Sequence, residues 1–536
     1  MASITNYPPA LTSAQKEHLA FTVKNWSIQH GLAVRPNPTF VAAEHDPNSS
    51  LATNAPVTLF PSPFPRVAFE HAQQLQEPYN ELYARISNDE EWLEDVLKDL
   101  IDVDGFVENL WKCHLKVKEE GYVQNLSLGL FRSDYMLDTS APETDTTDPS
   151  IKQVEFNTIS SSFGGLSALV SSLHTHLLSG KPSNPKAYPE HSLFRSSEDS
   201  TIANVPPANA SVSTLARAIA SAHTAYGLSK SSPSLPLCVL FLVQPTERNI
   251  FDQLAISEYL TNELSIPVFR LPTSTILGTT SIPSSNKSRP LLYTPPSSPA
   301  TQYEATVVYF RALYAPSEYD SPDSWTARIH LERSAAIKCP TVLTQLAGTK
   351  KVQQALTSSP PLADHLKNFL PGASPTLLSS IRATFAPQYP LTPMSNKVGA
   401  SNPGLDLALN ATTAENHVLK PQREGGGNNV YKLDIPPFLR SLKDKAEYKA
   451  WILMELIKPP DAKNVVLRQD GQVVTGDVVS ELGIFGGILW EKTPSSKEPR
   501  ILNNNSGGYL LRTKGKESNE GGVAAGFSSL DSILLY

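Results

Sequence analysis

Cysteine is scarce in this sequence, and its scarcity excludes two classes of protein. The chain of 536 residues holds three cysteines, Cys113, Cys238 and Cys339. Residues so few and so scattered supply neither the disulfide framework of a small secreted protein nor the paired ligands of a zinc cluster. Cys238 lies within the apolar run 237–243, so we expect it to be a buried strand residue.

The sequence also has no excess of basic residues over acidic ones. Lys and Arg number 45 against 52 Asp and Glu, which leaves a formal net charge of −7. Nucleic acids and anionic membranes bind concentrated basic surfaces, so we expect neither as the main partner. Any phosphate binding must therefore depend on a local group of cations.

Long apolar runs and a recognisable leader are absent as well. No window approaches the roughly 20 apolar residues of a membrane-spanning helix. Residues 1–8 contain neither the basic nor the apolar region of a secretory signal. With so little cysteine, these features lead us to expect a cytoplasmic protein in a reducing compartment.

What is present is the composition of a globular protein, with 40% hydrophobic and 18% charged residues. A chain of this length is expected to form two or three domains. Helical patterns begin it: the segment 14–30 is followed by Gly31, and residues 87–90 read as a capping box that starts a helix with apolar residues at 93, 96, 97 and 100.

A strand pattern follows these helices. Residues 126–130 and 152–157 alternate apolar with polar side chains, and a polar insertion at 139–149 separates them. We expect the two segments to pair as neighbouring strands. Their pairing would bring Arg132 near Glu155.

The middle third alternates strand, helix and strand. The segments 237–243, 250–264, 266–271 and 306–310 predict a small α/β domain with a mainly parallel sheet. Three Pro/Ser-rich stretches lie around them, at residues 183–213, 273–301 and 358–403. Because their composition buries little apolar surface, we expect long, mobile surface loops.

The last third returns to strands with glycine between them. The segments 450–455, 464–467, 484–490 and 508–512 are predicted to form one antiparallel sheet, flanked by two glycine-rich loops. The chain as a whole therefore reads as α+β or α/β.

The most informative segment is residues 420–429, which combines a lysine, an acid, three glycines and two asparagines. Glycines let backbone N–H groups approach an anion, while Lys420 can neutralise phosphate and Glu424 can hold a hard cation. The strand-like residues 417–419 would fix Lys420 at a strand end. The segment lacks the Gly-Lys-Ser/Thr of a P-loop, and a glycine run alone is more typical of a flexible loop.

A second pattern concerns Glu155 and Asn157. They are two residues apart on a predicted strand, so both side chains point to one face. Two such oxygen ligands suit magnesium, whereas a solvated strand face is the alternative interpretation. The hydroxyl-rich, glycine-ended turn at 158–165 favours a ligand site.

Nine short segments, taken together, resemble the eukaryotic glutathione synthetases. They follow that family's order between about residues 131 and 530, and they are VEFNTIS at 154–160, ERNIFDQ at 247–253, VVYFR at 307–311, IKCP at 337–340, QLAGTKKVQQ at 345–354, KPQREGGGNN at 420–429, SELGIFG at 480–486, LRTK at 511–514 and GGVAAG at 521–526.

The resemblance implies a circularly permuted ATP-grasp fold with an inserted parallel-sheet substrate domain. Residues 1–214 would supply N-terminal helices and the first part of the core, 215–345 the substrate-binding domain, and 346–536 the ATP-grasp domain with its lid loops. The implied reaction joins γ-glutamylcysteine to glycine through an acyl phosphate, with ATP as co-substrate and Mg²⁺ as metal. A homodimer is the implied assembly, with the N-terminal segments as its contact.

Functional residues are implied by the same motifs. The metal would be held by Glu155, Asn157 and Glu424, and catalysis would involve Arg512, Lys420 and Glu424. ATP would contact Glu155, Lys350, Lys420, Glu424, Gly425, Gly426, Gly427, Asn428, Asn429, Tyr431, Met454, Glu455, Leu456, Ile457, Glu481, Lys514 and Glu520. The other two substrates, the dipeptide and glycine, would contact Arg132, Ser160, Ser161, Ser162, Glu247, Arg248, Asn249, Gln253, Arg311, Tyr314, Arg512, Val523 and Ala524.

Two positions depart from the family pattern. Leu456 stands where related sequences carry lysine, and Glu520 stands where aspartate is usual. Within the implied adenine pocket, Tyr431 and residues 454–457 would contact the base, and Glu481 would meet the ribose hydroxyls or the adenine edge.

Alternatives stay open for single residues and for the whole chain. Lys350 and Lys514 are also compatible with solvated surface positions, and Arg311 with a structural salt bridge. A catalytically silent nucleotide-binding relative, and a ligase for β-alanine or serine, are the other functions. We expect loops 424–429 and 517–526 to be mobile without ligands and to close over them.

Overall fold

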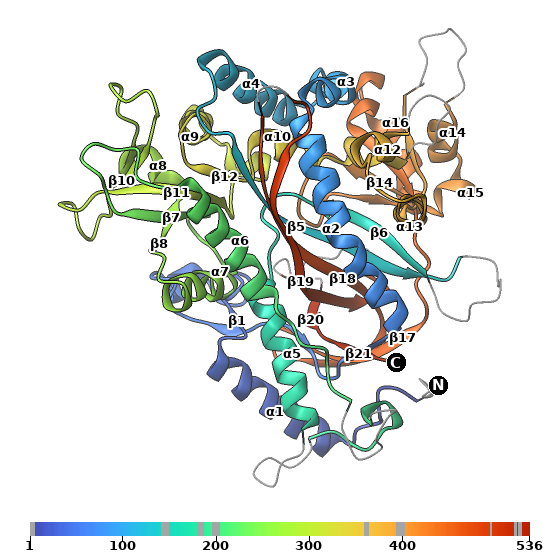
Figure 1. The fold of residues 1–536 in the computed structure, drawn as a ribbon. Coiled ribbons are helices and arrows are strands. Elements are labelled where there is room, and N and C mark those ends of the chain that lie inside the picture. The colour runs from blue at the N-terminus through green and yellow to red at the C-terminus, as the bar shows by residue number, and fades with distance from the viewer. Residues whose placement is uncertain are drawn as a thin grey trace.

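The computed structural model describes residues 6–140, 150–179, 187–195, 204–357, 364–392, 402–493, 496–518, 523 and 528–536. Within these ranges the protein is a mixed α/β structure with five β-sheets (Figure 1). The expectations for Glu520, for Ala524 and for most of the 139–149 insertion fall outside the described residues.

A seven-stranded sheet forms the centre of the molecule. It unites strands from both ends of the chain, in the order β17 (Ala462–Leu467), β3 (Val57–Thr58), β20 (Ser529–Asp531), β19 (Arg500–Gly515), β18 (Val473–Glu491), β5 (Leu126–Asp138) and β6 (Ser150–Asn157). The predicted pairing of β5 with β6 is confirmed and is antiparallel. Its register places Arg132 opposite Asn157, whereas Glu155 lies opposite Asp134.

Helices cover both faces of this sheet, which explains its apolar strands. Along β19, Leu510 belongs to one core, while Tyr509 and Leu511 belong to another. Helices α5 (Gly164–Leu178) and α6 (Ser211–Tyr226) pack on the first face, and α2 (Arg66–Asn88) packs on the second (Figure 1). Successive side chains of a strand point to opposite faces, so each core takes every second residue.

The second sheet confirms the predicted parallel domain and corrects one loop. Strands β8 (Val268–Pro272), β7 (Leu237–Val243), β11 (Tyr303–Phe310) and β12 (Ile337–Cys339) are parallel. The stretch 273–301, expected to be a loop, forms η4 (Thr273–Thr275), α8 (Ile276–Thr279), β9 (Thr280–Ser281) and β10 (Leu291–Tyr293). The prediction was wrong because the short apolar strand β10 is buried by pairing with β11.

The third sheet corrects two further predictions. Its order is β13 (Gln388–Pro390), β16 (Trp451–Glu455), β14 (His417–Pro421) and β15 (Val430–Tyr431), so β16 does not share a sheet with β17, β18 and β19. The Pro/Ser-rich stretch 358–403 contributes α12 (His365–Phe369), α13 (Pro375–Thr384) and β13 to the packed structure. Strand partners and burial against distant elements are not visible in local composition.

The remaining Pro/Ser-rich stretch, 183–213, is also partly ordered. Its described residues contain η2 (Ser192–Phe194), with Leu193 and Phe194 buried, and the start of α6. Two small sheets complete the topology, β1 (Ala33–Val34) with β2 (Thr53–Asn54), and β21 (Ile533–Leu535) with β4 (Ser62–Phe64).

Helix ends follow the sequence in one case and depart from it in another. Helix α1 (Ser13–His30) begins at the Thr12 capping box and ends at Gly31, whose φ of 74° is left-handed, as predicted. The capping box at 87–90 was wrong: Ser87 lies inside α2, and Asp89 caps α3 (Glu90–Ile101) by accepting from the Trp92 N–H.

Further helical segments complete the described structure. They are α4 (Gly105–Glu120), α7 (Ile250–Glu258), α9 (Pro322–Glu332), α10 (Val342–Ala347), α11 (Lys350–Thr357), α14 (Pro403–Leu409), α15 (Ala411–Ala414) and α16 (Ile435–Ser441), with η1 (Ala43–His45), η3 (Tyr259–Glu263), η5 (Pro316–Glu318), η6 (Lys432–Asp434) and η7 (Lys445–Ala450).

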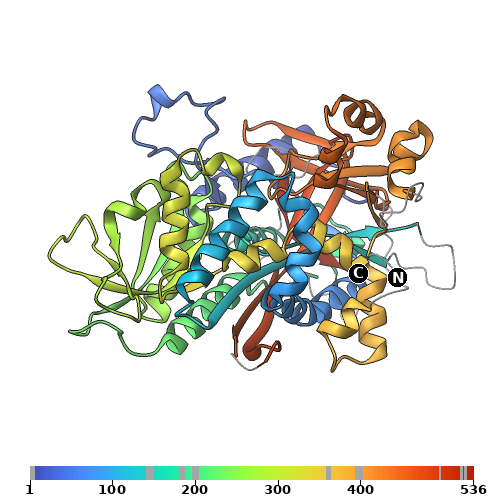
Figure 2. The ribbon, with the colours of Figure 1, turned by 90° about the horizontal axis from the view of Figure 1, so that it is seen from above.

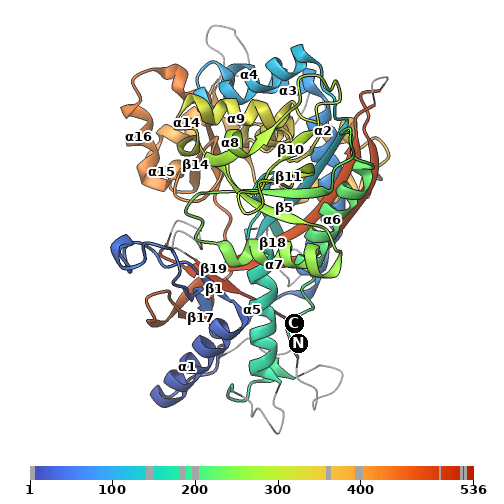
Figure 3. The ribbon, with the colours of Figure 1, turned by 90° about the vertical axis from the view of Figure 1, so that its left-hand side faces the viewer.

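The second sheet, which contains β7 and β11, and the third sheet, which contains β14 and β16, lie on opposite sides of the molecule. The seven-stranded sheet lies between them (Figures 1 and 2). Helices α1 and α5 pack together at one end (Figure 3).

All three cysteines are buried and free, as expected for Cys238. None of the described helices is long and apolar enough to cross a membrane.

One buried lysine yields a stability prediction. Lys338 on β12 is 2% exposed, and burial lowers the pKa of its ammonium from 10.5 to about 8. The unfolded chain therefore binds more protons between pH 8 and 10.5, and the charge costs about 3 kcal/mol at pH 7. Lys338→Met should raise the free energy of unfolding at pH 7 by up to that amount, and the gain should shrink toward pH 10.5.

The measurement is denaturant unfolding of parent and variant at pH 7 and at pH 10. Lys463→Met, at an exposed lysine, is the matched control and should change little. A destabilised Lys338→Met protein at pH 7 would show that the hydrogen bond from Nζ to the Ser334 carbonyl, 2.8 Å long, outweighs the cost of burial.

Candidate active site

A cavity of about 900 Å³ lies where the three large sheets meet. Its walls come from β5, β6, β18 and β19 of the central sheet, from the ends of β7 and β11, and from β14, β16 and the glycine-rich segment after β14. Residues separated by more than 300 positions in the sequence therefore face one space.

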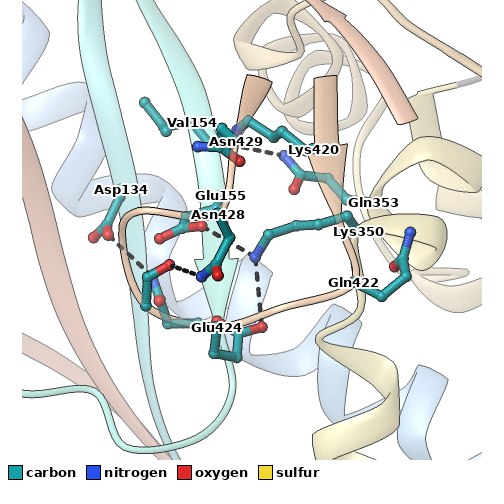
Figure 4. A network of polar contacts seen from close by, with 12 residues as sticks. Asp134, Val154, Glu155, Lys350, Gln353, Lys420, Gln422, Glu424, Asn428 and Asn429 are labelled. Atoms are coloured by element: carbon teal, nitrogen blue, oxygen red, sulfur yellow. Dashed lines mark hydrogen bonds and ion pairs between the residues drawn. The ribbon is translucent and has the colours of Figure 1, made fainter. Parts of the chain in front are cut away.

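A lysine and two carboxylates meet at the centre of the cavity (Figure 4). Lys350 is the first residue of α11, and its Nζ lies 3.0 Å from an oxygen of Glu155 and 3.4 Å from an oxygen of Glu424. Glu155 comes from β6, and Glu424 opens the glycine-rich segment. One lysine thus pairs with two acids from different parts of the chain.

The pKa values express this balance of charge. Burial alone would raise the pKa of Glu155, but Lys350, Lys420 and Arg512 lower it to about 2. Burial and the neighbouring Glu155 raise the pKa of Glu424 to about 7. Burial lowers the pKa of Lys350, and the two carboxylates overcome this and raise it.

Lys420 lies at the end of β14, as the sequence predicts. Its Nζ donates to the Val154 carbonyl at 2.8 Å, and burial lowers its pKa to about 8. Lys514 lines the same cavity from β19. The three lysines approach from different elements, so they can surround a phosphate chain without stacking their charges.

Asn157 and the two carboxylates offer the ligands that magnesium prefers. Carboxylate and amide oxygens are hard donors, and Mg²⁺ is commonly held by one or two carboxylates together with substrate phosphates. The described residues contain no group of three His, Cys, Asp or Glu side chains that could hold a metal by themselves. The donor set of Glu155, Asn157 and Glu424 therefore fits a metal that a phosphate chain also binds.

Two arginines lie beside these ligands. Arg132 on β5 and Arg512 on β19 both contact the buried carboxylate of Asp134, and Arg512 also pairs with Glu481. The β18–β19 register places Glu481 directly opposite Arg512. Glu481 thus lies at the arginine end of the cavity, and its predicted contact with ribose or adenine stays a prediction.

The glycine-rich segment adopts a backbone that suits glycine. Gly425 and Gly427 have φ of +83° and +94°, values that residues with a Cβ rarely adopt. Asn428 donates from Nδ2 to the Gly425 carbonyl at 3.2 Å, and Asn429 donates to the Tyr431 hydroxyl at 3.0 Å. Residues 425–428 are exposed, so a ligand can approach this segment.

An apolar slot lies next to this segment. Met454 and Val418 are cross-strand partners on β16 and β14, and they pack with Tyr431, Leu456 and Ile457. Such apolar side chains provide contact area for a flat base. The side chain of Leu456 adds to this surface where lysine would place a charge.

The far end of the cavity is lined by a buried arginine. Arg311 follows β11 and pairs with Asp252 at 3.0 Å through Nη2. Among the described residues, its Nε and Nη1 have no hydrogen-bond partner. The structural salt bridge considered from the sequence is therefore present, and it leaves the Nε and Nη1 donors of the guanidinium for a ligand such as a carboxylate.

Acidic and hydroxyl groups surround that arginine. Glu247 accepts from the Asn249 N–H at 2.7 Å and from Gln253, and Ser160 donates to the Phe310 carbonyl at 3.0 Å. Tyr314 contacts Gln244 at 3.2 Å. Carboxylate, hydroxyl and guanidinium groups together suit an amino acid with its ammonium and carboxylate.

Most of the residues predicted from the sequence line this one cavity. The described exceptions are Gly427, which is exposed, and Ser161 and Gln253, which are buried behind the wall. Ser161 is buried and donates to the Asn157 carbonyl, and buried Gln253 supports Glu247. Arg248, Val523, Ser162 and Asn249 line the cavity, and their predicted substrate contacts stay predictions.

Sequence reasoning missed several residues of the site. Gln244, Thr246, Val479, Lys516 and Ser518 line the cavity. Asp134, Asp252 and Glu318 support it from behind: Glu318 accepts the N–H groups of Leu313, Tyr314 and Ala315, each at 3.0 Å. An acid two positions after Arg132 on one strand, as Asp134 is, was the available signal.

The layout of the cavity suits a nucleotide, with cations and backbone N–H groups for its phosphates and an apolar slot for its base. Fold and site thus define a nucleotide-dependent enzyme of the mixed α/β class. Residues 13–535 match the family model of the eukaryotic glutathione synthase ATP-binding domain. The chain belongs to the eukaryotic glutathione synthetase family, whose members are ATP-dependent ligases.

Individual relatives agree over nearly the whole chain. The glutathione synthetase large chain of Schizosaccharomyces pombe is 37% identical over 98% of both chains. Human glutathione synthetase is 37% identical over 98% of this chain and 99% of its own. A glutathione synthetase-like effector from Globodera pallida has the same fold, with a TM-score of 0.70 at 20% identity and 98% coverage of both chains.

Proposed function

We propose that this protein joins γ-L-glutamyl-L-cysteine to glycine with ATP, and that Glu155, Asn157 and Glu424 hold Mg²⁺ against the phosphates. The convergence of two buried carboxylates on Lys350, beside the exposed glycine-rich segment, carries the proposal. A catalytically silent relative would have no need to hold two acids and three lysines around one space.

The first chemical step is the attack of the cysteinyl carboxylate on the γ-phosphate of ATP. Lys350, Lys420 and Lys514 offset the charge that develops on the phosphoryl oxygens, and bound Mg²⁺ adds further positive charge there. The bond between the γ-phosphorus and the β-phosphate oxygen breaks, so the products are ADP and an acyl phosphate, an electrophile that the free carboxylate is not. The exposed residues 425–428 can cover it and exclude water.

The second step is the attack of the glycine amine on the acyl phosphate, which releases phosphate and forms the amide. A tetrahedral oxyanion develops, and Arg132 and Arg512 lie beside Asn157 where they can stabilise it. Arg512 and Val523 are proposed to receive glycine, and Arg311 to bind a carboxylate of the dipeptide.

We further propose the finer features that the family implies for this chain. The fold is a circularly permuted ATP-grasp arrangement, supported by a central sheet that unites β3, β5 and β6 with β17–β20. The domain boundaries 1–214, 215–345 and 346–536, the homodimer and the cytoplasmic location are proposals of the same kind.

The direct test is phosphate release from ATP with γ-glutamylcysteine and one acceptor at a time. Glycine should support turnover, while β-alanine and serine should be poorer, since one methylene or hydroxymethyl changes binding by ~1–3 kcal/mol. Turnover with β-alanine equal to that with glycine would contradict the acceptor. No turnover with any acceptor, despite ATP binding, would favour the silent relative.

A variant of Arg311 tests the dipeptide end. Lysine can keep one ion pair with Asp252 but cannot also present the separate Nε and Nη1 donors of the guanidinium to a carboxylate. Arg311→Lys should raise the KM for γ-glutamylcysteine about 10- to 100-fold, the range of ~1.4–2.8 kcal/mol, and leave the KM for ATP near normal. Initial rates at varied dipeptide and ATP concentrations give both values.

Arg328→Lys is the matched control for that experiment. Arg328 is fully buried, stacks over Phe310 and pairs with Glu332 and Gln345 away from the cavity. Its replacement should lower the unfolding temperature without changing either KM. If Arg311→Lys behaves in the same way, Arg311 has a structural role only.

A further inference from the structure

Asp134 is a buried carboxylate to which three separate site residues connect. It lies on β5 with no exposed surface, and among the described residues it does not line the cavity. Arg132 donates to both its oxygens, from Nε at 2.6 Å and Nη2 at 2.8 Å. Asn157 donates from Nδ2 at 3.0 Å, and Arg512 donates from Nη2 at 2.9 Å.

The hydrogen bond from Asn157 fixes the orientation of its amide. The Nδ2 group has two partners, an Asp134 carboxylate oxygen and the Arg132 carbonyl at 3.2 Å, and both can only accept. A flipped amide would place Oδ1 against two acceptors, so the flip is unfavourable. Asp134 thereby keeps the Oδ1 atom of Asn157, the metal-binding atom, directed away from itself.

The same carboxylate holds two guanidinium groups close together. Arg132 also donates from Nη1 to the Ser162 carbonyl at 3.0 Å, and Arg512 also pairs with Glu481. Two arginines at one place repel each other unless an anion lies between them. Asp134 supplies this anion, and its buried position leaves the cavity side of both arginines open to substrate.

The neighbouring strand leaves the space that this arrangement needs. Gly483 on β18 lies directly opposite Asp134 in the sheet. A Cβ at position 483 would lie 2.7 Å from Arg132 Cδ and 2.7 Å from Asp134 Oδ1. Glycine at 483 is therefore part of the same arrangement, since any side chain would displace the pair.

We propose that Asp134 is a positioning residue that couples the metal site to the substrate arginines. One carboxylate sets the Asn157 carbonyl for the cation and the Arg132 and Arg512 guanidinium groups for the reacting carboxylate and the acceptor. This inference rests on the proposed function for its substrates, but its metal arm can be measured without turnover.

The test is Asp134→Asn. Its amide places an N–H group, which cannot accept, against side chains that donate to the carboxylate of Asp134. Outer residues that orient metal ligands commonly change metal affinity 10- to 100-fold. We expect the affinity for Mn²⁺, titrated by electron paramagnetic resonance on the enzyme with a non-hydrolysable ATP analogue, to fall about 10-fold or more. The KM for glycine should rise by a similar factor.

Glu304→Gln is the matched control. Glu304 is another fully buried carboxylate, at the start of β11, and it accepts from Tyr226, Ser229 and Ser231 outside the cavity. Glu304→Gln should lower the unfolding temperature and leave Mn²⁺ affinity and the KM for glycine unchanged. If Asp134→Asn shows only this pattern, its role is structural and the proposal is overturned.

A double variant separates the two arms of the coupling. If Asp134 acts on the metal through Asn157, adding Asp134→Asn to Asn157→Ala should cause no further loss of Mn²⁺ affinity, yet should still raise the KM for glycine. A further loss equal to that of the single variant would overturn the coupling. Failure of the proposed function appears differently, as wild-type enzyme that binds Mn²⁺ with the nucleotide but does not use glycine.

Gly483→Ala provides a second approach if Asp134→Asn does not fold. It retains the carboxylate, but its Cβ would displace Arg132 and Asp134. The loss of Mn²⁺ affinity and the rise in the KM for glycine should therefore both appear in weaker form. Unchanged Mn²⁺ affinity and unchanged KM for glycine in a folded Gly483→Ala protein would overturn the proposal.

Discussion

Replacing Glu424 with glutamine is expected to lower kcat a few hundred-fold while the protein stays folded. The change removes one negative charge that holds the cation at the transferring phosphate, and one such contact contributes about 3–4 kcal/mol to the transition state. Stability should not fall, because burial and Glu155 raise the pKa of Glu424 to about 7, so its ionised form is unfavourable in the free enzyme.

The measurement is kcat from phosphate release at saturating substrates, together with the unfolding temperature. Glu415→Gln, at an exposed position before β14, serves as the control and should retain full activity. A Glu424→Gln enzyme within a few-fold of the parent would show that Glu424 does not hold the metal.

Replacing Lys350 with methionine is expected to impair both activity and stability. Phosphate neutralisation by Lys350 should contribute about 100-fold or more to kcat. Its loss also leaves Glu155 and Glu424 without their shared cation, and breaking a buried pair from one side costs about 3–5 kcal/mol. The free variant should therefore unfold more readily than the parent.

The pH dependence of this loss has a definite sign. The lowered pKa of Glu155, about 2, contributes stability above its normal pKa of 4.5, and part of this contribution comes from Lys350. Glu424 is fully ionised only above about pH 7. The difference between parent and Lys350→Met should thus be largest above pH 7 and shrink toward pH 4.5.

Unfolding of both proteins at pH 8 and pH 5.5 measures this difference. Lys351→Met changes the next residue of α11, whose Nζ bonds to Gln354 instead, and should show neither the loss of activity nor the pH dependence. A Lys350→Met protein as stable as the parent at pH 8 would mean that water, rather than Lys350, compensates the two carboxylates.

Local patterns correctly predicted elements whose partners are near in the sequence, and elements with a strongly apolar run or a glycine that ends a helix. The pairing of β5 with β6, the parallel sheet around β7 and β11, and the left-handed Gly31 at the end of α1 are confirmed. Alternation, apolar runs and glycine preferences express steric rules that act within a few residues.

Predictions that required a distant partner were less successful. Strand β16 has the same apolar pattern as the strands of the central sheet, yet it pairs with β13 and β14. The Pro/Ser-rich stretches have few apolar residues, but Leu291 and Leu193 are enough to anchor them once a neighbouring surface is present. Composition indicates how much apolar surface a segment can bury, but it does not indicate which other part of the protein will cover that surface.

For the site, the sequence by itself determined the types of residue and, through the order of its motifs, the family. It supplied Glu155, Asn157, Lys420 and Glu424 as candidates because acids, amides and lysines next to glycines suit a metal and a phosphate chain. Tertiary structure alone decided that Lys350 bridges two acids, that Arg311 keeps two donors free and that Asp134 joins Asn157 to two arginines. These outcomes depend on distances of about 3 Å between residues from different helices, strands and loops, and electrostatic and hydrogen-bond energies are set by such distances rather than by position in the chain.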